Sequence, residues 1–208
     1  SIVSIDSVKG TGINRLKSML KDRMKDRVER DKEKGRLFRP IRTMVAGVPN
    51  VGKSSFINKI AGKASTVTGN KPGVTRGKQW IRVTQGLELL DTPGVLWPRL
   101  DDQEAALKLA ATGALKEEVM DCESVALWLL EWLKKNYPGV LKRRYRIPAL
   151  PADNNILFEM IGLKRGLVLT GGRLDRFKTA VAILKEFREG RIGRFTLDPC
   201  PETPGSSK

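Results

Sequence analysis

Residues 47–54 of this 208-residue chain read Gly-Val-Pro-Asn-Val-Gly-Lys-Ser, which matches the pattern Gly-x-x-x-x-Gly-Lys-Ser. A glycine-rich loop of this kind binds phosphate when it follows a strand and opens a helix, because the first N–H groups of the helix then point at the anion. The apolar run 44–46, which ends a short strand that begins near Ile41, and the helix-like segment 54–60 provide that context. We therefore expect Lys53 to contact phosphate oxygens and the Ser54 hydroxyl to bind Mg²⁺.

A second motif, Asp91-Thr92-Pro93-Gly94, follows the apolar stretch 87–90. An aspartate at the end of a strand reaches the same metal ion when its strand and the phosphate loop share one sheet edge. We therefore expect Asp91 to contact magnesium through water and the Gly94 N–H to sense the γ-phosphate. This form of the motif is typical of GTPases and not of ABC-type ATPases.

Between the two motifs lies Lys71-Pro72-Gly73-Val74-Thr75, in a segment rich in Gly and Thr. A threonine at this place can close over the phosphates and offer its hydroxyl to the metal. Lys53, Thr75 and Gly94 are therefore the predicted catalytic groups. The chain contains no histidine, so any proton transfer must use carboxylates, water or the substrate phosphate.

The composition predicts a polyanionic partner. The chain has 39 Lys+Arg against 23 Asp+Glu, a formal charge of +16 and a pI near 10.1. It has no apolar run of the roughly 18 residues that a membrane span needs and no signal-peptide pattern, so we expect no membrane association. Cys122 and Cys200 are isolated, which argues against disulfides or zinc and favours a reducing compartment. The cytoplasm is the expected location, with the mitochondrial matrix as the alternative.

Periodicity divides the chain into two domains and a tail. Apolar residues recur at helical spacing from Ile13 to Val28, and the runs 41–46, 79–83 and 87–90 predict strands, the last two as a hairpin. Beyond residue 98 the pattern predicts helices over 105–115, 123–135, 156–161 and 176–188, with loops at 136–139 and 148–151. We expect a GTPase domain over 1–98, a helical domain over 99–198, and a disordered tail over 199–208.

The guanine-specificity element of GTPases, Asn-Lys-x-Asp, is missing after Asp91, where the ordinary motif order would put it. In contrast, Ser4-Ile5-Asp6-Ser7, at the end of a short β-like run over 1–5, is similar to the loop that normally comes last and backs the base. This order argues against a GTPase of ordinary topology.

The segments 4–7, 47–55, 72–75 and 89–98 together closely resemble the circularly permuted GTPases of the ribosome biogenesis GTPase A type. The resemblance implies an α/β fold, in which a permuted P-loop GTPase domain with a mostly parallel sheet, incomplete here, precedes a C-terminal α-helical domain. In that family the guanine-specificity element precedes the segment corresponding to Ser1. We therefore expect these residues to be the C-terminal part of a longer protein.

The resemblance also implies a set of ligand-binding residues. The expected nucleotide contacts are Asp6, Ser7, Asn50, Val51, Gly52, Lys53, Ser54, Ser55 and Gly94. The expected magnesium ligands are Ser54, Thr75 and Asp91. Asn50 resembles the asparagine of GTPases that bind potassium, although a hydrogen bond that stabilises the loop is an equally simple role.

Val95 stands where ordinary small GTPases have the catalytic glutamine. The family uses an upstream histidine, and this chain has none. We therefore expect very slow hydrolysis unless the ribosomal particle activates it.

Basic clusters in the second half predict RNA contacts through phosphates, since the few aromatic residues argue against base stacking. The candidate residues are Arg143, Arg144, Lys164, Arg165, Arg176 and Lys178. The simpler interpretation is that these charges only keep the chain in solution.

The preferred function is that of a monomeric GTP-binding and GTP-hydrolysing assembly factor for the large ribosomal subunit precursor, which binds rRNA in the GTP state. The alternative is an RNA-binding or interaction module with an impaired nucleotide site.

Overall fold

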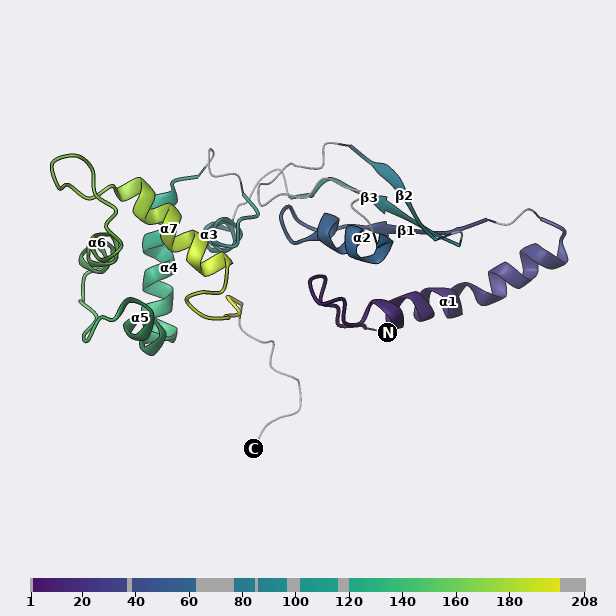
Figure 1. Ribbon diagram of the computed structural model, residues 1–208, viewed down its shortest axis with the longest axis horizontal. Coiled ribbons are helices and arrows are strands. Elements are labelled where there is room, and N and C mark those ends of the chain that lie inside the picture. Colours follow the sequence, from purple (N-terminus) through teal and green to yellow (C-terminus); the bar gives the residue numbers. More distant parts are fainter. Residues whose placement is uncertain are drawn as a thin grey trace, which may run out of the picture. The chain divides into compact units, whose positions relative to one another are not determined.

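The computed structural model describes residues 2–36, 39–62, 77–84, 86–96, 102–115 and 120–198. It divides into two compact units, Ser1–Pro98 and Arg99–Lys208, which are described separately here (Figure 1). The predictions for Thr75, for most of the segment between the two units and for the tail over 199–208 lie outside the described residues. Within the described residues, no helix is long and apolar enough to cross a membrane.

The first unit contains a three-stranded sheet in the order β1-β3-β2. Its strands are β1 (Ile41–Val45), β2 (Gln79–Thr84) and β3 (Leu87–Asp91). β1 and β3 are parallel, whereas β2 and β3 are antiparallel, so the predicted hairpin is confirmed. The described part of the sheet is thus mixed and not mostly parallel, because a connection as short as that between β2 and β3 can join only antiparallel strands.

Two helices pack on one face of this sheet, α1 (Ile13–Glu33) and α2 (Lys53–Ala61). Residues alternate across the strands, so Leu87, Leu89 and Asp91 of β3 are buried. Leu87 and Leu89 share a core with Ile57 and Ile60 of α2 and with the first turn of α1. Figure 1 shows α1 and α2 on the same side of the strands. This packing fixes the strand ends that carry the two phosphate-site motifs.

The β-like run predicted over 1–5 is wrong for the residues described, because residues 2–5 form no strand. No strand pairs with them among the described residues, and the chain enters a turn. The Asp6 N–H donates to the Thr11 carbonyl (3.1 Å) and the Gly10 N–H donates to the Asp6 carbonyl (2.7 Å). The segment therefore leads into α1 as a hydrogen-bonded turn.

The second unit consists of five helices, if only its described residues are considered. They are α3 (Gln103–Ala111), α4 (Cys122–Asn136), α5 (Pro138–Tyr145), α6 (Asn154–Lys164) and α7 (Arg176–Arg188). Four of them begin after an aspartate whose carboxylate accepts N–H bonds from the first turn: Asp102, Asp121, Asp153 and Asp175. Such N-caps satisfy backbone donors that have no partner within the helix.

α4 forms the centre of this helical unit. Its residues Leu129, Leu130 and Leu133 are completely buried, and Phe158 of α6 and Leu184 of α7 pack in the same cluster. In Figure 1, α4 runs behind α7 and lies between α3 and α6. The predicted helix over 176–188 is confirmed with the same bounds, and the other predicted helices are confirmed with shifted ends.

The loop predicted over 136–139 is wrong in its second half, because α5 begins at Pro138. Proline fits the first turn of a helix, where its missing N–H has no intrahelical acceptor to lose. α5 ends at Tyr145, and its C-cap Arg146 adopts a left-handed conformation (φ 52°). The basic cluster over 142–146 therefore lies on a helix and its C-terminal exit.

Candidate nucleotide site and basic surface

The two phosphate-site motifs meet because β1 and β3 are parallel and in register. Val45, the last residue of β1, pairs with Asp91, the last residue of β3. The glycine-rich loop leaves β1 and the Asp-Thr-Pro-Gly segment leaves β3 at the same edge of the sheet. Ligands of open α/β sheets bind at this carboxyl edge.

The loop 47–52 has the curvature of a phosphate cradle. Gly52 adopts φ 91° and Asn50 adopts φ 59°, a left-handed conformation that is uncommon for a residue with a side chain. Helix α2 begins directly after Gly52, at Lys53, and no side chain caps its N-terminus. The N–H groups of the first turn therefore remain available to an anion.

The Lys53 side chain curls back over the loop. Its ammonium group donates to the carbonyls of Gly47 (3.0 Å) and Val48 (2.8 Å). Burial lowers the pKa of Lys53, and the negative charge of Asp91 acts in the opposite direction. A partly desolvated cation at this place interacts more strongly with phosphate oxygens than an exposed one would.

Asp91 is a buried carboxylate without full hydrogen bonding. It has no exposed surface, and neither of its oxygens has a hydrogen-bond partner of full geometry within the described residues. Burial raises the pKa of Asp91, while the Lys53 charge and weaker contacts of Thr92, Gln79 and Ser54 act to lower it. Oxygen ligands of this type next to a serine hydroxyl fit Mg²⁺.

The Asp91–Gly94 segment is attached to the loop. The Thr92 hydroxyl donates to the Val45 carbonyl (2.7 Å), and the Val95 N–H donates to the Gly47 carbonyl (3.2 Å). Gly94 packs so closely that a Cβ there would lie 2.5 Å from the Pro49 nitrogen. Only glycine fits this position without a shift of the loop. The Val95 side chain, at the place of the catalytic glutamine, is two-thirds exposed.

The remaining predicted nucleotide contacts are distributed unevenly. Val51 and Ser55 are exposed beside Lys53, at the mouth of the loop and on the first turn of α2. The Asp6 carboxylate makes its hydrogen bonds within its own turn, where it accepts the N–H groups of residues 8 and 9. These bonds lower the pKa of Asp6, and the Lys9 N–H contributes most. Asp6 and Ser7 therefore belong to the turn before α1. The structure shows no contact of this turn with the loop among the described hydrogen bonds, and its approach to α2 is at Lys59, near the opposite end of the helix.

Two of the predicted RNA-binding arginines converge on one buried carboxylate. Arg144 donates to Glu186 at 2.9 Å, and Arg165 forms an ion pair with the same side chain. Glu186 lies on α7 and is only 8% exposed, so it joins the ends of α5 and α6 to α7. Sequence reasoning missed Glu186. The available signal was an acidic residue beside the apolar stripe of a predicted helix.

Three more of these residues have partners within the unit. Arg176 binds Glu123 (2.7 Å) and Glu159 (3.0 Å). Lys164 donates to the carbonyls of Tyr145 (3.2 Å) and Arg146 (2.7 Å), and Lys178 pairs with Asp175 at the N-terminus of α7. These charges therefore stabilise the helical unit, whatever else they bind.

Arg143 differs from the other five, because no ion pair or side-chain hydrogen bond joins it to any residue that the structure describes. Arg188, in the basic cluster of the last helix, donates to the carbonyls of Ala110 (3.0 Å) and Ala111 (3.1 Å). It thereby caps the C-terminal end of α3 from α7. Most of the basic residues that sequence clustering highlighted have a structural role as well.

Comparison with known proteins gives the family. The family model described as "50S ribosome-binding GTPase" matches residues 42–144. Ribosome biogenesis GTPase A of Priestia megaterium is 43% identical over 94% of this chain and 68% of its own length, and that of Bacillus pumilus is 41% identical over 94% and 70%. A solved GDP-bound structure of TM YlqF has a TM-score of 0.54 and 27% identity, covering 86% of this chain and 77% of its own.

The glycine-rich loop, the Asp-Thr-Pro-Gly segment at the same sheet edge and the identity to these relatives agree with one another. The α/β fold with a phosphate-binding loop is therefore that of a GTPase. The chain belongs to the ribosome biogenesis GTPase A family.

Proposed function

We propose that the first unit binds GTP with Mg²⁺ and hydrolyses it at the edge of the sheet where β1 and β3 end. The observation that supports this proposal best is the in-register pair Val45 and Asp91, from which the two phosphate-site motifs leave the sheet together. Phosphoryl transfer to water needs positioning and charge stabilisation more than covalent chemistry. Lys53 and the N-terminal N–H groups of α2 supply positive charge for the β- and γ-phosphates.

The residues around Asp91 suit a magnesium ion. Ser54, Thr75 and, through water, Asp91 would hold it. When bound, the ion neutralises charge on the phosphate oxygens and orients them for attack by water. The N–H of Gly94 would contact the γ-phosphate when GTP is bound. The hydrogen bond from the Val95 N–H to the Gly47 carbonyl holds the Gly94 segment next to the loop.

The position of Val95 suggests that hydrolysis by the chain alone is slow. A valine side chain has no hydrogen-bonding group with which to orient water, and the chain has no histidine. We infer that the ribosomal particle accelerates the reaction. Asn50 is our candidate for a potassium ligand, because its left-handed backbone conformation places it at a bend in the phosphate loop.

We propose the precursor of the large ribosomal subunit as the partner, bound through rRNA in the GTP state and released after hydrolysis. The family description and the names of the relatives support the ribosomal connection. The formal charge of +16 supports contact with RNA, since cations that neutralise phosphates release counterions. The expected location is the cytoplasm and the expected form is a monomer, with the mitochondrial matrix as the alternative location.

Calorimetric titration of the chain with GTP and with ATP, each with Mg²⁺, tests the proposal. Micromolar binding of GTP with ATP excluded is the expected result. If neither nucleotide binds, the chain is better described as an RNA-binding or interaction module with an impaired nucleotide site. The same titration with GDP then shows whether the affinity depends on the γ-phosphate.

A further inference from the structure

The segment between α6 and α7 forms a short hairpin that extends from the helical unit (Figure 1). Val168 and Leu174 form an antiparallel bridge. The Leu169 N–H donates to the Arg173 carbonyl at 2.7 Å, which closes the turn. We call residues 166–175 the basic hairpin. Its backbone is defined by hydrogen bonds and is not an irregular loop.

The tip and base of the basic hairpin are both fixed. Gly171 (φ 89°) and Gly172 (φ 78°) adopt left-handed conformations that make the tight tip possible. At the base, Leu174 packs so closely on Gly162 of α6 that a Cβ on this glycine would clash with it. The Thr179 hydroxyl also approaches Gly162 and donates to the Asp175 carbonyl (2.8 Å). The hairpin therefore presents its side chains on a rigid support.

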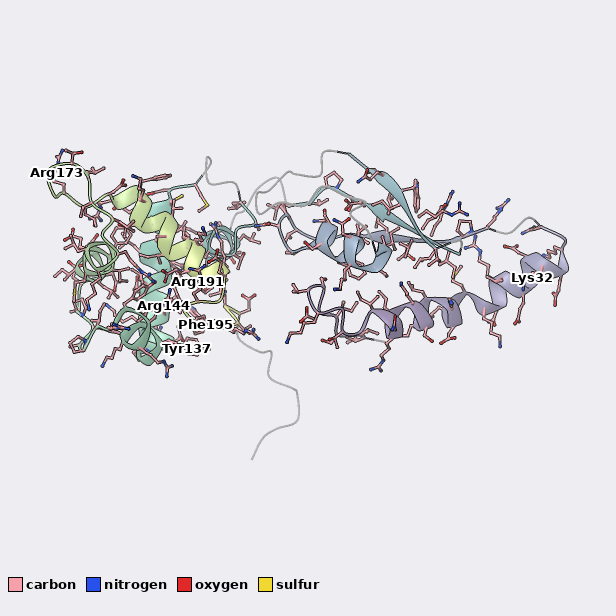
Figure 2. All side chains as sticks on the ribbon, viewed as in Figure 1. Lys32, Tyr137, Arg144, Arg173, Arg191 and Phe195 are labelled. Carbon is pink, nitrogen blue, oxygen red and sulfur yellow. The ribbon has the colours of Figure 1, made fainter. Side chains whose placement is uncertain are left out.

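Arg173 is the one basic residue within the basic hairpin, and Lys164 and Arg165 come just before it. The one acidic residue of the hairpin, Asp175, is engaged at the base, where it caps α7 and pairs with Lys178. Arg173 directly follows the two tip glycines, on the strand that returns to α7, and it is exposed and points outward in Figure 2. Its side chain has no ion pair or hydrogen bond with any residue that the structure describes. At the base, the ion pair with Glu186 holds Arg165, which keeps more than a third of its side-chain surface exposed.

Aliphatic side chains accompany these charges. Val168 and Leu169 are each 45% exposed, although the hairpin that carries them is ordered by hydrogen bonds. Exposed apolar side chains grouped on a defined element indicate a contact surface more often than isolated ones do. Combined with cations, they suit a partner that is both polyanionic and able to accept apolar contacts.

We propose that the basic hairpin is an rRNA-binding element, with Arg173 contacting phosphates at its tip and Arg165 at its base. This inference rests on the proposed function, because it assumes that the helical unit binds RNA. Folded RNA offers closely spaced phosphates and ribose faces, which match the cations and the aliphatic residues respectively. The hairpin has no aromatic residue for base stacking, so it should recognise RNA shape and not sequence.

The test compares Arg173→Ala with Lys135→Ala, both of which remove one exposed cation from the helical unit. Lys135 is near the end of α4, two residues before Tyr137, and Figure 2 shows Tyr137 and Arg173 at opposite ends of this unit. Binding of the full chain with GTP is measured on protein-free large-subunit rRNA and on intact large subunits over a range of salt concentrations. Thermal unfolding checks that both variants fold.

Each phosphate contact contributes about 0.9 to the salt slope, which is the decrease in log affinity per unit of log salt concentration. For Arg173→Ala we therefore expect the salt slope of rRNA binding to fall by about 1 and the affinity to fall roughly eightfold at about 0.1 M salt. Lys135→Ala should change neither. Equal effects of the two variants, or no effect of Arg173→Ala, would overturn the inference. Loss of binding to intact subunits with rRNA binding unchanged would also overturn it, since the partner would then be a ribosomal protein. If the unaltered chain binds no rRNA at all, the proposed RNA partner fails together with the hairpin.

Discussion

Val45 and Asp91 are paired as the last residues of two parallel strands. As a result, a loop that can hold phosphate and a carboxylate that can hold a metal ion leave the sheet within one strand spacing of each other, about 4.8 Å. Lys53 and Asp91 then influence each other's pKa, although they are far apart in sequence. The predictions below test this arrangement and the ion pairs of the helical unit.

Lys53→Ala should weaken GTP binding by about tenfold to a hundredfold, because hydrogen bonds to charged groups contribute about 1.5–3 kcal/mol. Fluorescence titration with a labelled GTP analogue measures the change. Lys59→Ala, which removes an exposed cation from the other end of α2, is the matched control and should keep the original affinity. Unchanged affinity in Lys53→Ala would contradict the proposed site.

Gly94→Ala should reduce both GTP affinity and stability, since the new Cβ would meet the backbone of Pro49. Forcing an extra carbon into a close contact costs about 1–3 kcal/mol. Gly77→Ala is the control, because a Cβ at Gly77 would meet nothing within 4 Å. Thermal unfolding and GTP titration of both variants test this expectation, and equal behaviour would show that the approach of Gly94 to the loop is unimportant.

Asp91→Asn should make the protein more stable than the original at neutral pH when metal and nucleotide are removed with a chelator. Burial raises the pKa of Asp91 above 3.8, so the folded protein holds this proton more tightly than the unfolded chain does. Stability contributed by this group is therefore present below pH 3.8 and is lost as the pH rises through the higher pKa of the folded state. The difference in melting temperature between variant and original should shrink as the pH falls. The variant should also lose the stabilisation that Mg²⁺ with GTP gives to the original chain.

Asn50→Gly separates the backbone conformation of this residue from the function of its side chain. Glycine can keep the left-handed backbone (φ 59°) but removes the side chain that would bind potassium. We expect faster GTP hydrolysis by the original chain in potassium than in sodium buffer, and equal rates in the two buffers for the variant. If the original chain itself hydrolyses GTP equally in both buffers, the potassium site is ruled out.

Glu186→Gln should destabilise the helical unit by about 1–3 kcal/mol, because it leaves Arg144 and Arg165 without their shared anionic partner. This free energy is smaller than that of breaking a fully buried ion pair, because both arginines are partly exposed. Glu189→Gln is the control, because it breaks the more exposed ion pair with Arg191. Pairs at the surface contribute about 0–1 kcal/mol. Urea unfolding of both variants gives the comparison, and equal free energies of unfolding would argue against a structural role for Glu186.

The elements that carry the phosphate-site motifs were predictable from sequence because their signals are local. The strand that ends at Val45, the helix that begins at Lys53 and the hairpin before Asp91 follow from apolar runs and glycine positions. Since the carboxyl ends of parallel strands meet at one edge, the proximity of the two motifs could also be inferred. The binding roles of these residues stay predictions.

The uses of the basic residues could not be predicted in this way. Arg144 and Glu186 are far apart in sequence, and nothing local links them before α5 and α7 pack together. The start of α5 was missed because Pro138 and Gly139 were interpreted as a turn, although proline also favours the first position of a helix. Residues 2–5 show the opposite error, since strand-like composition forms no strand without a neighbour.

The bonds from Lys53 to the Gly47 and Val48 carbonyls have a kinetic consequence. They hold the glycine-rich turn in its curved shape before any anion arrives, so little conformational entropy remains to be lost when a nucleotide docks. Preorganisation of this kind lowers the free-energy cost of binding. The lifetime of the bound nucleotide would then be set by the contacts to phosphate and metal, not by refolding of the protein.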